Sequence, residues 1–252
     1  MIGCARMRFK FGPLFIPDVR KATLSAAFRG LPLPDNGNCV SGCNECLHVC
    51  PTGAISLSPL TIDMGKCVFC GDCVAACTHG AIRFSNFHHL ATTERDRLKV
   101  SGISVEEYKK TAVTPPENAG MFRNSFKFRQ VSAGGCSSCE MELNACSNVN
   151  FDMGRFGLEF VASPRHADGL VITGPISENM ALALEDTYQA MPDPRIVIVV
   201  GACAISGGVF AESKALNRSF FDRHKVDLYI PGCPVHPLNF INGILDFLNL
   251  RK

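Results

Sequence analysis

Short, unbroken apolar runs alternate with helical patterns in the second half of the chain. Three runs rich in Val, Ile and Leu are each followed by glycine within two residues and predict strands: residues 169–173, 195–200 and 226–230. Ser177 precedes apolar positions at helical spacing and is a predicted helix N-cap, and a C-terminal helix is predicted from about Pro237 to Leu250. Strands without polar alternation, separated by helices, predict a parallel sheet covered on both faces.

The first 125 residues have a different pattern and divide into three segments. Residues 1–38 are basic and aromatic at the start and then rich in proline and glycine, which predicts a basic N-terminal arm. Residues 39–84 hold two clusters of cysteines. Residues 85–125 lack cysteine, contain a short helical candidate at Val105–Lys110, and are predicted to be a connector. Residues 126–252 then form one larger domain.

Composition narrows the class of protein. A chain of 252 residues, 46% of them hydrophobic, suits one or two domains with a packed core. The net charge of +2 argues against nucleic-acid binding through phosphate contacts. The longest apolar run, Ile196 to Ile205, is about half of the roughly 20 residues that a membrane helix requires, so no transmembrane segment is expected. No export signal is expected either, and 14 cysteines in such a chain favour metal binding over disulfides.

Eight of the cysteines form two clusters that repeat each other. The clusters are Cys39, Cys43, Cys46 and Cys50, and then Cys67, Cys70, Cys73 and Cys77. The last three cysteines recur at an offset of 27 residues, as do the segments 53–55 and 80–82, both Gly-Ala-Ile. Thiolates at C-x2-C-x2-C-x3-C spacing bind cubane iron–sulfur clusters, with the fourth cysteine reaching across to the other cluster. The predicted ligand sets are therefore Cys39, Cys43, Cys46 with Cys77, and Cys67, Cys70, Cys73 with Cys50. Zinc sites, which C-x-x-C pairs also form, are the alternative.

Four further cysteines predict a third site. Cys136 and Cys139 lie just before a predicted helix, whereas Cys203 and Cys233 follow the second and third predicted strands. Because ligands bind at the carboxyl ends of strands in open α/β sheets, these thiolates should meet at one edge. Neighbouring glycines let backbone N–H groups approach the sulfur atoms. We predict a third [4Fe–4S] cluster there, with ordinary buried cysteines as the alternative.

Both cysteine-bearing regions resemble known families. The repeat resembles a bacterial two-cluster [4Fe–4S] ferredoxin over residues 39–84, although three residues rather than two separate Cys39 from Cys43. Residues 126–252 resemble the small electron-transfer subunit shared by respiratory complex I and the membrane-bound, group 4 [NiFe] hydrogenases such as formate hydrogenlyase. The matching motifs are GGCSSCEME, FGLEFVASPRHADGLVITGP, MPDPRIVIVVGACAISGG and VDLYIPGCPVHP. The resemblance implies an α/β fold class, with an N-terminal two-[4Fe–4S] ferredoxin-like unit and a C-terminal flavodoxin-like parallel sheet domain.

Two details of the sequence favour the hydrogenase branch of this family. Cys136 and Cys139 have C-x-x-C spacing, whereas the complex I branch is expected to have adjacent paired cysteines. The segment SPRHAD, residues 163–168, is also more similar to the hydrogenase version. Fusion of a ferredoxin unit to this subunit departs from the common arrangement of separate polypeptides.

The resemblance implies that the chain is an electron-transfer subunit of an oxidoreductase complex. We expect three [4Fe–4S] clusters that connect a low-potential donor with a [NiFe] large subunit. No active site of its own is expected, because no second C-x-x-C pair remains to bind nickel. Expected partners are that large subunit, membrane subunits, and a donor such as ferredoxin, formate dehydrogenase or carbon monoxide dehydrogenase, but no nucleic acid. The expected location is peripheral, on the cytoplasmic side of the cytoplasmic membrane.

Four further residues, Glu140, His166, Cys4 and Cys146, are interpreted separately from the ligand sets. Glu140 is a candidate for proton relay or cluster orientation, with a helix-start acid near the positive dipole end as the alternative. His166 is predicted to be a structural histidine, with hydrogen bonding to the third cluster as the alternative. The two leftover cysteines, Cys4 and Cys146, are predicted to be structural, Cys146 as a buried thiol.

Two other functions remain open. The chain could be the equivalent subunit of a complex I-like or nickel-free relative, which the large subunit's own cysteines would decide. It could also be a non-catalytic redox sensor or cluster carrier, which would be stable and soluble alone. A nicotinamide-dependent oxidoreductase has no support, because no G-x-G-x-x-G follows a strand.

Overall fold

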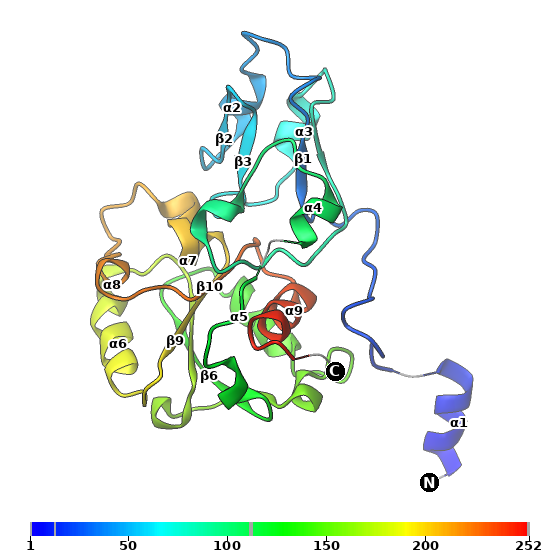
Figure 1. Cartoon of the computed structure of the whole chain (residues 1–252), viewed down its shortest axis with the longest axis vertical. Coiled ribbons are helices and arrows are strands. Elements are labelled where there is room, and N and C mark those ends of the chain that lie inside the picture. Colours follow the sequence, from blue (N-terminus) through cyan, green and yellow to red (C-terminus); the bar gives the residue numbers. More distant parts are fainter. Residues whose placement is uncertain (1, 13, 111–112, 251–252) are drawn as a thin grey trace.

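The computed structural model describes residues 2–12, 14–110 and 113–250, with side chains from residue 6 onward. Cys4 therefore lies outside the described side chains, and its predicted structural role stays a prediction. The cysteine-rich part stands on one side of the α/β domain, and the N-terminal helix α1 (Ile2–Phe11) lies apart from both (Figure 1).

Five parallel strands form the central sheet of the larger domain. In chain order they are β6 (Phe126–Ser132), β7 (Leu158–Phe160), β8 (Gly169–Thr173), β9 (Ile196–Val200) and β10 (Leu228–Ile230). The spatial order is β10-β9-β8-β6-β7, and all four pairings are parallel. Counted within the domain this order is 2-1-3-4-5 from one edge, the flavodoxin-like arrangement. The predicted fold class is therefore confirmed.

Helices cover both faces of this sheet, as the strand pattern predicts. They are α5 (Ser138–Ala145), α6 (Glu178–Gln189), α7 (Ala202–Ser206), α8 (Phe220–Arg223) and α9 (Pro237–Phe247). Val171 and Ile198 share one core with α5 and α9, whereas Ile172 and Val199 share the other with α6 and α8. Alternate strand residues point to opposite faces, so β8 and β9, which are buried along their whole length, must be apolar on both faces.

The cysteine-rich part contains two small antiparallel sheets and three short helices. The helices are α2 (Glu45–Val49), α3 (Asp72–Ala76) and α4 (Val105–Lys109), and the strands are β1 (Pro32–Pro34), β2 (Ile55–Ser56), β3 (Thr61–Asp63), β4 (Ile82–Phe84) and β5 (Lys99–Val100). Single turns of 3-10 helix complete the chain: η1 (Arg95–Leu98), η2 (Ala119–Phe122), η3 (Met153–Phe156), η4 (Pro164–His166) and η5 (Gly208–Phe210). Helices α2 and α3 are separated by the same 27 residues as the cysteine repeat.

Segments outside residues 39–84 complete these small sheets. Strand β1, from the predicted arm, pairs with β4, and β5, from the predicted connector, pairs with β3. Without β1 and β5, residues 39–84 would keep only the β2–β3 pair and the single strand β4, and a two-stranded pair alone is barely stable in water. The boundary that we propose for the ferredoxin-like unit therefore includes these two flanking strands.

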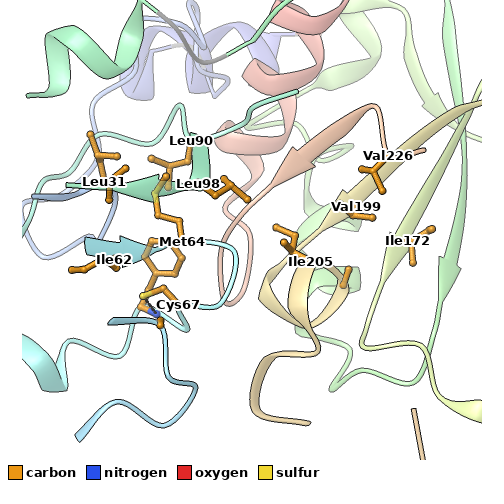
Figure 2. Close-up of a cluster of buried hydrophobic side chains, with 14 of the residues drawn as sticks. Leu31, Ile62, Met64, Cys67, Leu90, Leu98, Ile172, Val199, Ile205 and Val226 are labelled. Carbon is orange, nitrogen blue, oxygen red and sulfur yellow. Dashed lines mark hydrogen bonds between the residues drawn. The ribbon is translucent and has the colours of Figure 1, made fainter. Parts of the chain in front are cut away.

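The two parts share one hydrophobic core. Leu31, Ile62 and Leu98 from the cysteine-rich part and Ile205 from the domain belong to the same buried cluster (Figure 2). Arg95 forms two 2.8 Å hydrogen bonds to the carboxylate of Asp63, next to this contact. Continuous burial of this kind holds the cysteine sets of the two parts at defined separations. Within the described ranges, every helix is too short or too polar to cross a membrane.

A buried histidine makes this junction sensitive to acid. His88 is only 4% exposed, and no hydrogen-bond partner for its Nε2 exists among the described residues. Burial lowers the pKa of His88 to about 3, with repulsion from His89 and His236 adding to the effect. His88 is therefore neutral in the fold, whereas an unfolded histidine takes up a proton below a pH of about 6.5.

We expect the junction to be stable above pH 6.5 and to weaken as pH falls towards 3. One such histidine lowers the free energy of unfolding by about 1.4 kcal/mol per pH unit in that window. Amide hydrogen exchange over residues 84–98, compared at pH 7 and pH 5, should show faster opening at pH 5. The variant His88→Gln should reduce this difference, with His89, whose pKa burial also lowers, accounting for part of the remainder, whereas the exposed control His79→Gln should change nothing. An unchanged pH dependence in His88→Gln would contradict the assignment.

Candidate metal centres

The first predicted set of four cysteines converges. Cys46 lies in α2, and Cys77 is the C-cap of α3. Burial raises the pKa of the Cys46 thiol, and the charges of Cys39, Cys77 and Cys43 raise it further. These three neighbours are the ones that the spacing predicts as its companions. The fourth cysteine of the second cluster thus reaches across to the first, as in a two-cluster arrangement.

The second predicted set converges in the same way. Burial raises the pKa of Cys67 to about 12, and the charges of Cys73, Cys50 and Cys70 add to the shift. Cys73 also interacts with Cys46 of the first set, and its pKa is raised to about 11, mainly by burial. The two sets are therefore neighbours.

Backbone N–H groups donate to sulfur at both of these sites. Ala54 donates to Cys50 Sγ and Ala81 to Cys77 Sγ, each at 3.3 Å, and these two contacts are related by the 27-residue repeat. Phe69 donates to Cys67 Sγ, also at 3.3 Å. Hydrogen bonds of this kind favour the charged thiolate and tune a bound cluster.

The third set meets at the carboxyl edge of the large sheet. Cys203 follows β9 and Cys233 follows β10, while Cys136 lies between β6 and α5 and Cys139 lies in the first turn of α5. Burial raises the pKa of Cys203 to about 11, with further contributions from Cys233 and Cys136. Burial likewise raises the pKa of Cys139 to about 12, and Glu140, Cys233 and Cys203 add to it.

Two glycines leave room for the sulfur atoms of the third set. A Cβ on Gly201 would lie 2.7 Å from Cys139 Sγ, and one on Gly208 would lie 2.9 Å from Cys203 Sγ. Both distances are shorter than a carbon–sulfur contact allows. Gly201 and Gly208 also have φ values of +90° and +55°, in the region that favours glycine. The backbone is therefore shaped around these two thiols.

Three groups of four thiols fit three cubane clusters. Gathered thiols repel one another as thiolates, so they need positive charge, which the iron of a cluster provides. No three His, Cys, Asp or Glu side chains converge on a single ion within the part of the chain that the structure describes. A cubane holds its thiolates further apart than one ion does, because each binds a different iron.

The three sets lie in series. Burial raises the pKa of Cys73 in the second set, and the charge of Cys46 in the first set raises it further. Burial raises the pKa of Cys233 in the third set, and the charges of Cys136 in its own set and of Cys70 in the second set raise it further. The second set therefore lies next to each of the other two.

The remaining predicted residues are placed as follows. Cys146 is fully buried, and its thiol lies 3.4 Å from the carbonyl oxygen of Glu142, so the prediction of a buried thiol is confirmed. Glu140 lies in the first turn of α5 and accepts hydrogen bonds from Ser132 and Thr173, both at 2.7 Å. It links the helix to strands β6 and β8, which favours an orienting role.

The alternative in which His166 donates a hydrogen bond to the third cluster is wrong. His166 lies in η4, just before β8, and is exposed. It is thus at the amino end of the sheet, whereas the third set lies at the carboxyl end. The five residues of β8 separate the two edges by about 16 Å at 3.3 Å per residue.

Sequence patterns did not reveal one residue beside the third set. Arg218, in the loop before α8, donates to the backbone carbonyls of Cys203, Ala204 and Ile205. A single arginine in a loop matches no sequence motif, so its place beside the third set could not be predicted. Only the fold brings it to Cys203.

The fold and the cysteine sets are those of an iron–sulfur electron-transfer protein. A family profile described as "NADH ubiquinone oxidoreductase, 20 Kd subunit" matches residues 136–247, and one described as "4Fe-4S dicluster domain" matches residues 38–81. The chain belongs to the first of these families and carries a dicluster domain in front of it.

Named relatives fall in both branches of this family. The probable membrane-bound hydrogenase subunit mbhJ of Pyrococcus furiosus is 39% identical over 115 residues, which are 46% of this chain and 69% of that protein. Formate hydrogenlyase subunit 7 of Escherichia coli is 40% identical over 130 residues, 52% of this chain and about half (51%) of that protein. An NADH-quinone oxidoreductase subunit of Clostridium beijerinckii is 42% identical over 112 residues, 44% of this chain and 66% of that protein.

Similarity extends to solved structures. One of them is a chain of the membrane-bound sulfane sulfur reductase, an archaeal respiratory membrane complex, with 26% sequence identity and a TM-score of 0.46. The match covers 52% of this chain and 72% of that chain.

The chain is therefore an iron–sulfur electron-transfer subunit of the membrane-bound hydrogenase and complex I-like family. Its relatives are subunits of oxidoreductases and of membrane-bound complexes. The first named relative and the C-x-x-C spacing at Cys136 and Cys139 agree on hydrogenase-related proteins.

Proposed function

We propose that this chain carries electrons through three [4Fe–4S] clusters, between a low-potential donor and the [NiFe] large subunit of a membrane-bound hydrogenase complex. The observation that carries the proposal is the serial placement of the three cysteine sets, in which Cys46 interacts with Cys73 and Cys70 with Cys233. When bound, each cluster takes up and gives back one electron at a time. The chain contributes the thiolates that hold the clusters and the rigid core that fixes their separations.

The residues around each site suit this role. N–H groups of Ala54, Phe69 and Ala81 donate to thiolates and so stabilise the added negative charge. The shared core of the two parts excludes water from the middle of the series, where Cys67 and Cys73 are buried. Electrons could therefore pass along the series without large movements of the chain.

The third set lies at a surface suited to a partner subunit. Cys136 and Cys233 are exposed. Large apolar side chains close to this set in sequence are exposed as well: Met141 at 71%, Val209 at 57% and Phe210 at 44%. Exposed apolar groups beside a redox site are typical of a surface that is covered in a complex. The large subunit is the partner that we place there.

The donor side would be the first set, which lies at the opposite end of the series. Val40 and Leu47, beside Cys39 and Cys46, are exposed at 48% and 37%. A ferredoxin, a formate dehydrogenase or a carbon monoxide dehydrogenase is a suitable donor for such a surface. We propose a peripheral position on the cytoplasmic side of the membrane, held there by membrane subunits.

The equivalent subunit of a complex I-like or nickel-free complex is the second candidate. Sequence identity to the NADH-quinone oxidoreductase subunit of Clostridium beijerinckii, at 42%, is as high as that to the hydrogenase relatives. Such a chain would use the same three sites but deliver electrons to a different centre.

The test is hydrogen-dependent viologen reduction by the native complex, isolated without oxygen through a tag on this chain. Activity that copurifies with the tag would support the hydrogenase function. A cluster-loaded complex without activity, after maturation has been checked, would favour the nickel-free relative. Chain that purifies alone, stable and loaded, would instead favour a redox sensor or cluster carrier.

A further inference from the structure

Arg218 donates hydrogen bonds to four backbone carbonyls beside the third cysteine set. Its guanidinium donates to Cys203 at 3.3 Å, to Ala204 and Ile205 at 2.9 Å each, and to Pro175 at 3.1 Å. The first three acceptors belong to the segment that carries the ligand Cys203, and Pro175 belongs to the loop after β8. One side chain therefore ties together two loops at the carboxyl edge of the sheet.

This guanidinium has no acidic partner. Among the described residues, no Asp or Glu lies within ion-pair distance of Arg218. Burial lowers the pKa of Arg218 and the charge of Arg95 lowers it further, whereas the charge of Cys203 raises it. Arg95 is itself paired with Asp63, so that carboxylate is already engaged. Carbonyl oxygens near the C-terminal end of α7 and the ring of Phe221, whose centroid lies 4.9 Å from the guanidinium carbon, compensate part of its positive charge, but no carboxylate does.

A half-buried positive charge without a carboxylate partner is costly, because water no longer screens or solvates it fully. A site of four thiolates supplies the missing negative charge, since a loaded [4Fe–4S] site carries a net negative charge in both of its redox states. The position of Arg218 next to Cys203 is therefore explained if the third site is loaded.

We propose that Arg218 is the fixed counter-cation of the third cysteine set, and that its charge raises the reduction potential of that site. The inference rests on the proposed function, because it requires a cluster on Cys136, Cys139, Cys203 and Cys233. Uptake of one electron from the second site adds one negative charge beside Cys203, while every thiolate stays bound and no proton is transferred. A fixed positive charge stabilises the reduced form more than the oxidised form.

The raised reduction potential favours electron flow towards the partner, because the third site lies next to the partner surface. A higher potential at the third site draws electrons away from the second site and towards the partner surface. Arg218 would thus be a positioning residue that acts through the cluster rather than a group that contacts the substrate.

The experiment is a redox titration of the native complex, followed by electron paramagnetic resonance, with Arg218→Met and Arg218→Lys. Methionine keeps much of the length and removes the charge, whereas lysine keeps the charge but cannot make all four hydrogen bonds. For Arg218→Met we expect the equilibrium constant for one-electron reduction of one cluster to fall about tenfold, a shift of about 59 mV to more negative potential. Arg218→Lys should stay close to the unaltered protein. Arg223→Met in α8, which breaks a surface ion pair with Glu185 of α6, is the matched control and should shift nothing.

The outcomes separate this inference from the proposed function. Absence of the third cluster's signal from the unaltered complex would overturn the proposed function itself. With that signal present, an unchanged potential in Arg218→Met would overturn the role of Arg218. An equal shift in Arg218→Lys would also overturn it, because the charge is retained there. If Arg218→Met fails to load the third site, a loaded Arg218→Lys with native potential supports the role. Failure of both variants to load would assign Arg218 to hydrogen bonding alone.

Discussion

Replacement of Cys233 by alanine is expected to abolish electron delivery to the partner while leaving the first two cysteine sets loaded. The iron content of the chain should fall by about one third, because one of three four-thiolate sites is lost. Cys233 is exposed and its side chain supports no core, so the fold should persist. Iron analysis and viologen reduction by the tagged complex measure the two effects.

Cys146→Ala is the control for this experiment. Among the cysteines with described side chains, Cys146 alone lies outside the three sets. Its replacement should lower stability slightly, through the loss of a buried sulfur, but should leave iron content and activity unchanged. Loss of all iron from Cys233→Ala, rather than about one third, would contradict three separately loaded sites.

Replacement of Gly201 by alanine is expected to empty the third site with almost no change in side-chain size. The new Cβ would lie 2.7 Å from Cys139 Sγ, so the sulfur or the backbone must move. The φ of +90° and ψ of 156° add about 1–3 kcal/mol of backbone strain for any residue other than glycine. Loss of the third cluster's paramagnetic signal, with the other two retained, is the expected measurement.

Two other glycines serve as control positions that distinguish a steric clash of the new Cβ from backbone strain. Gly12 has a φ of +71° but nothing within 4 Å of an added Cβ, and Gly120 has open space without a positive φ. Alanine at either position should leave all three signals in place. If Gly201→Ala also keeps its third signal, the close fit of backbone to Cys139 does not matter for loading.

Much of the candidate site could be predicted because the spacing of cysteines in the sequence is itself typical of iron–sulfur cluster binding. The repeat predicted which thiols of residues 39–84 share a site, and the structure groups Cys46 with Cys39, Cys43 and Cys77. Strands β8, β9 and β10 were predicted because buried parallel strands are continuous apolar runs. Strand β6 was not predicted, since Lys127, Arg129 and Gln130 interrupt its apolar residues, although it pairs with a neighbour on each side.

Other features depended on contacts between distant segments. The alternative role of His166 at the third cluster was wrong because a residue near a motif in sequence can lie at the opposite edge of the sheet. Strands β1 and β5 joined the cysteine-rich part only through pairing with β4 and β3. Pairing of short strands is decided by the neighbours that they find, and their local sequence gives little indication of it.

The sequence by itself therefore determined the ligand type, the division into sets and the parallel character of the domain. These properties follow from local spacing and local hydrophobicity. Only the tertiary structure decided the order of the three sets, the approach of Cys70 to Cys233 and the position of Arg218 beside Cys203. Each of these depends on how two parts of the chain pack against each other. Tertiary packing sets the distance between two charged groups in a folded protein, and their separation along the chain does not.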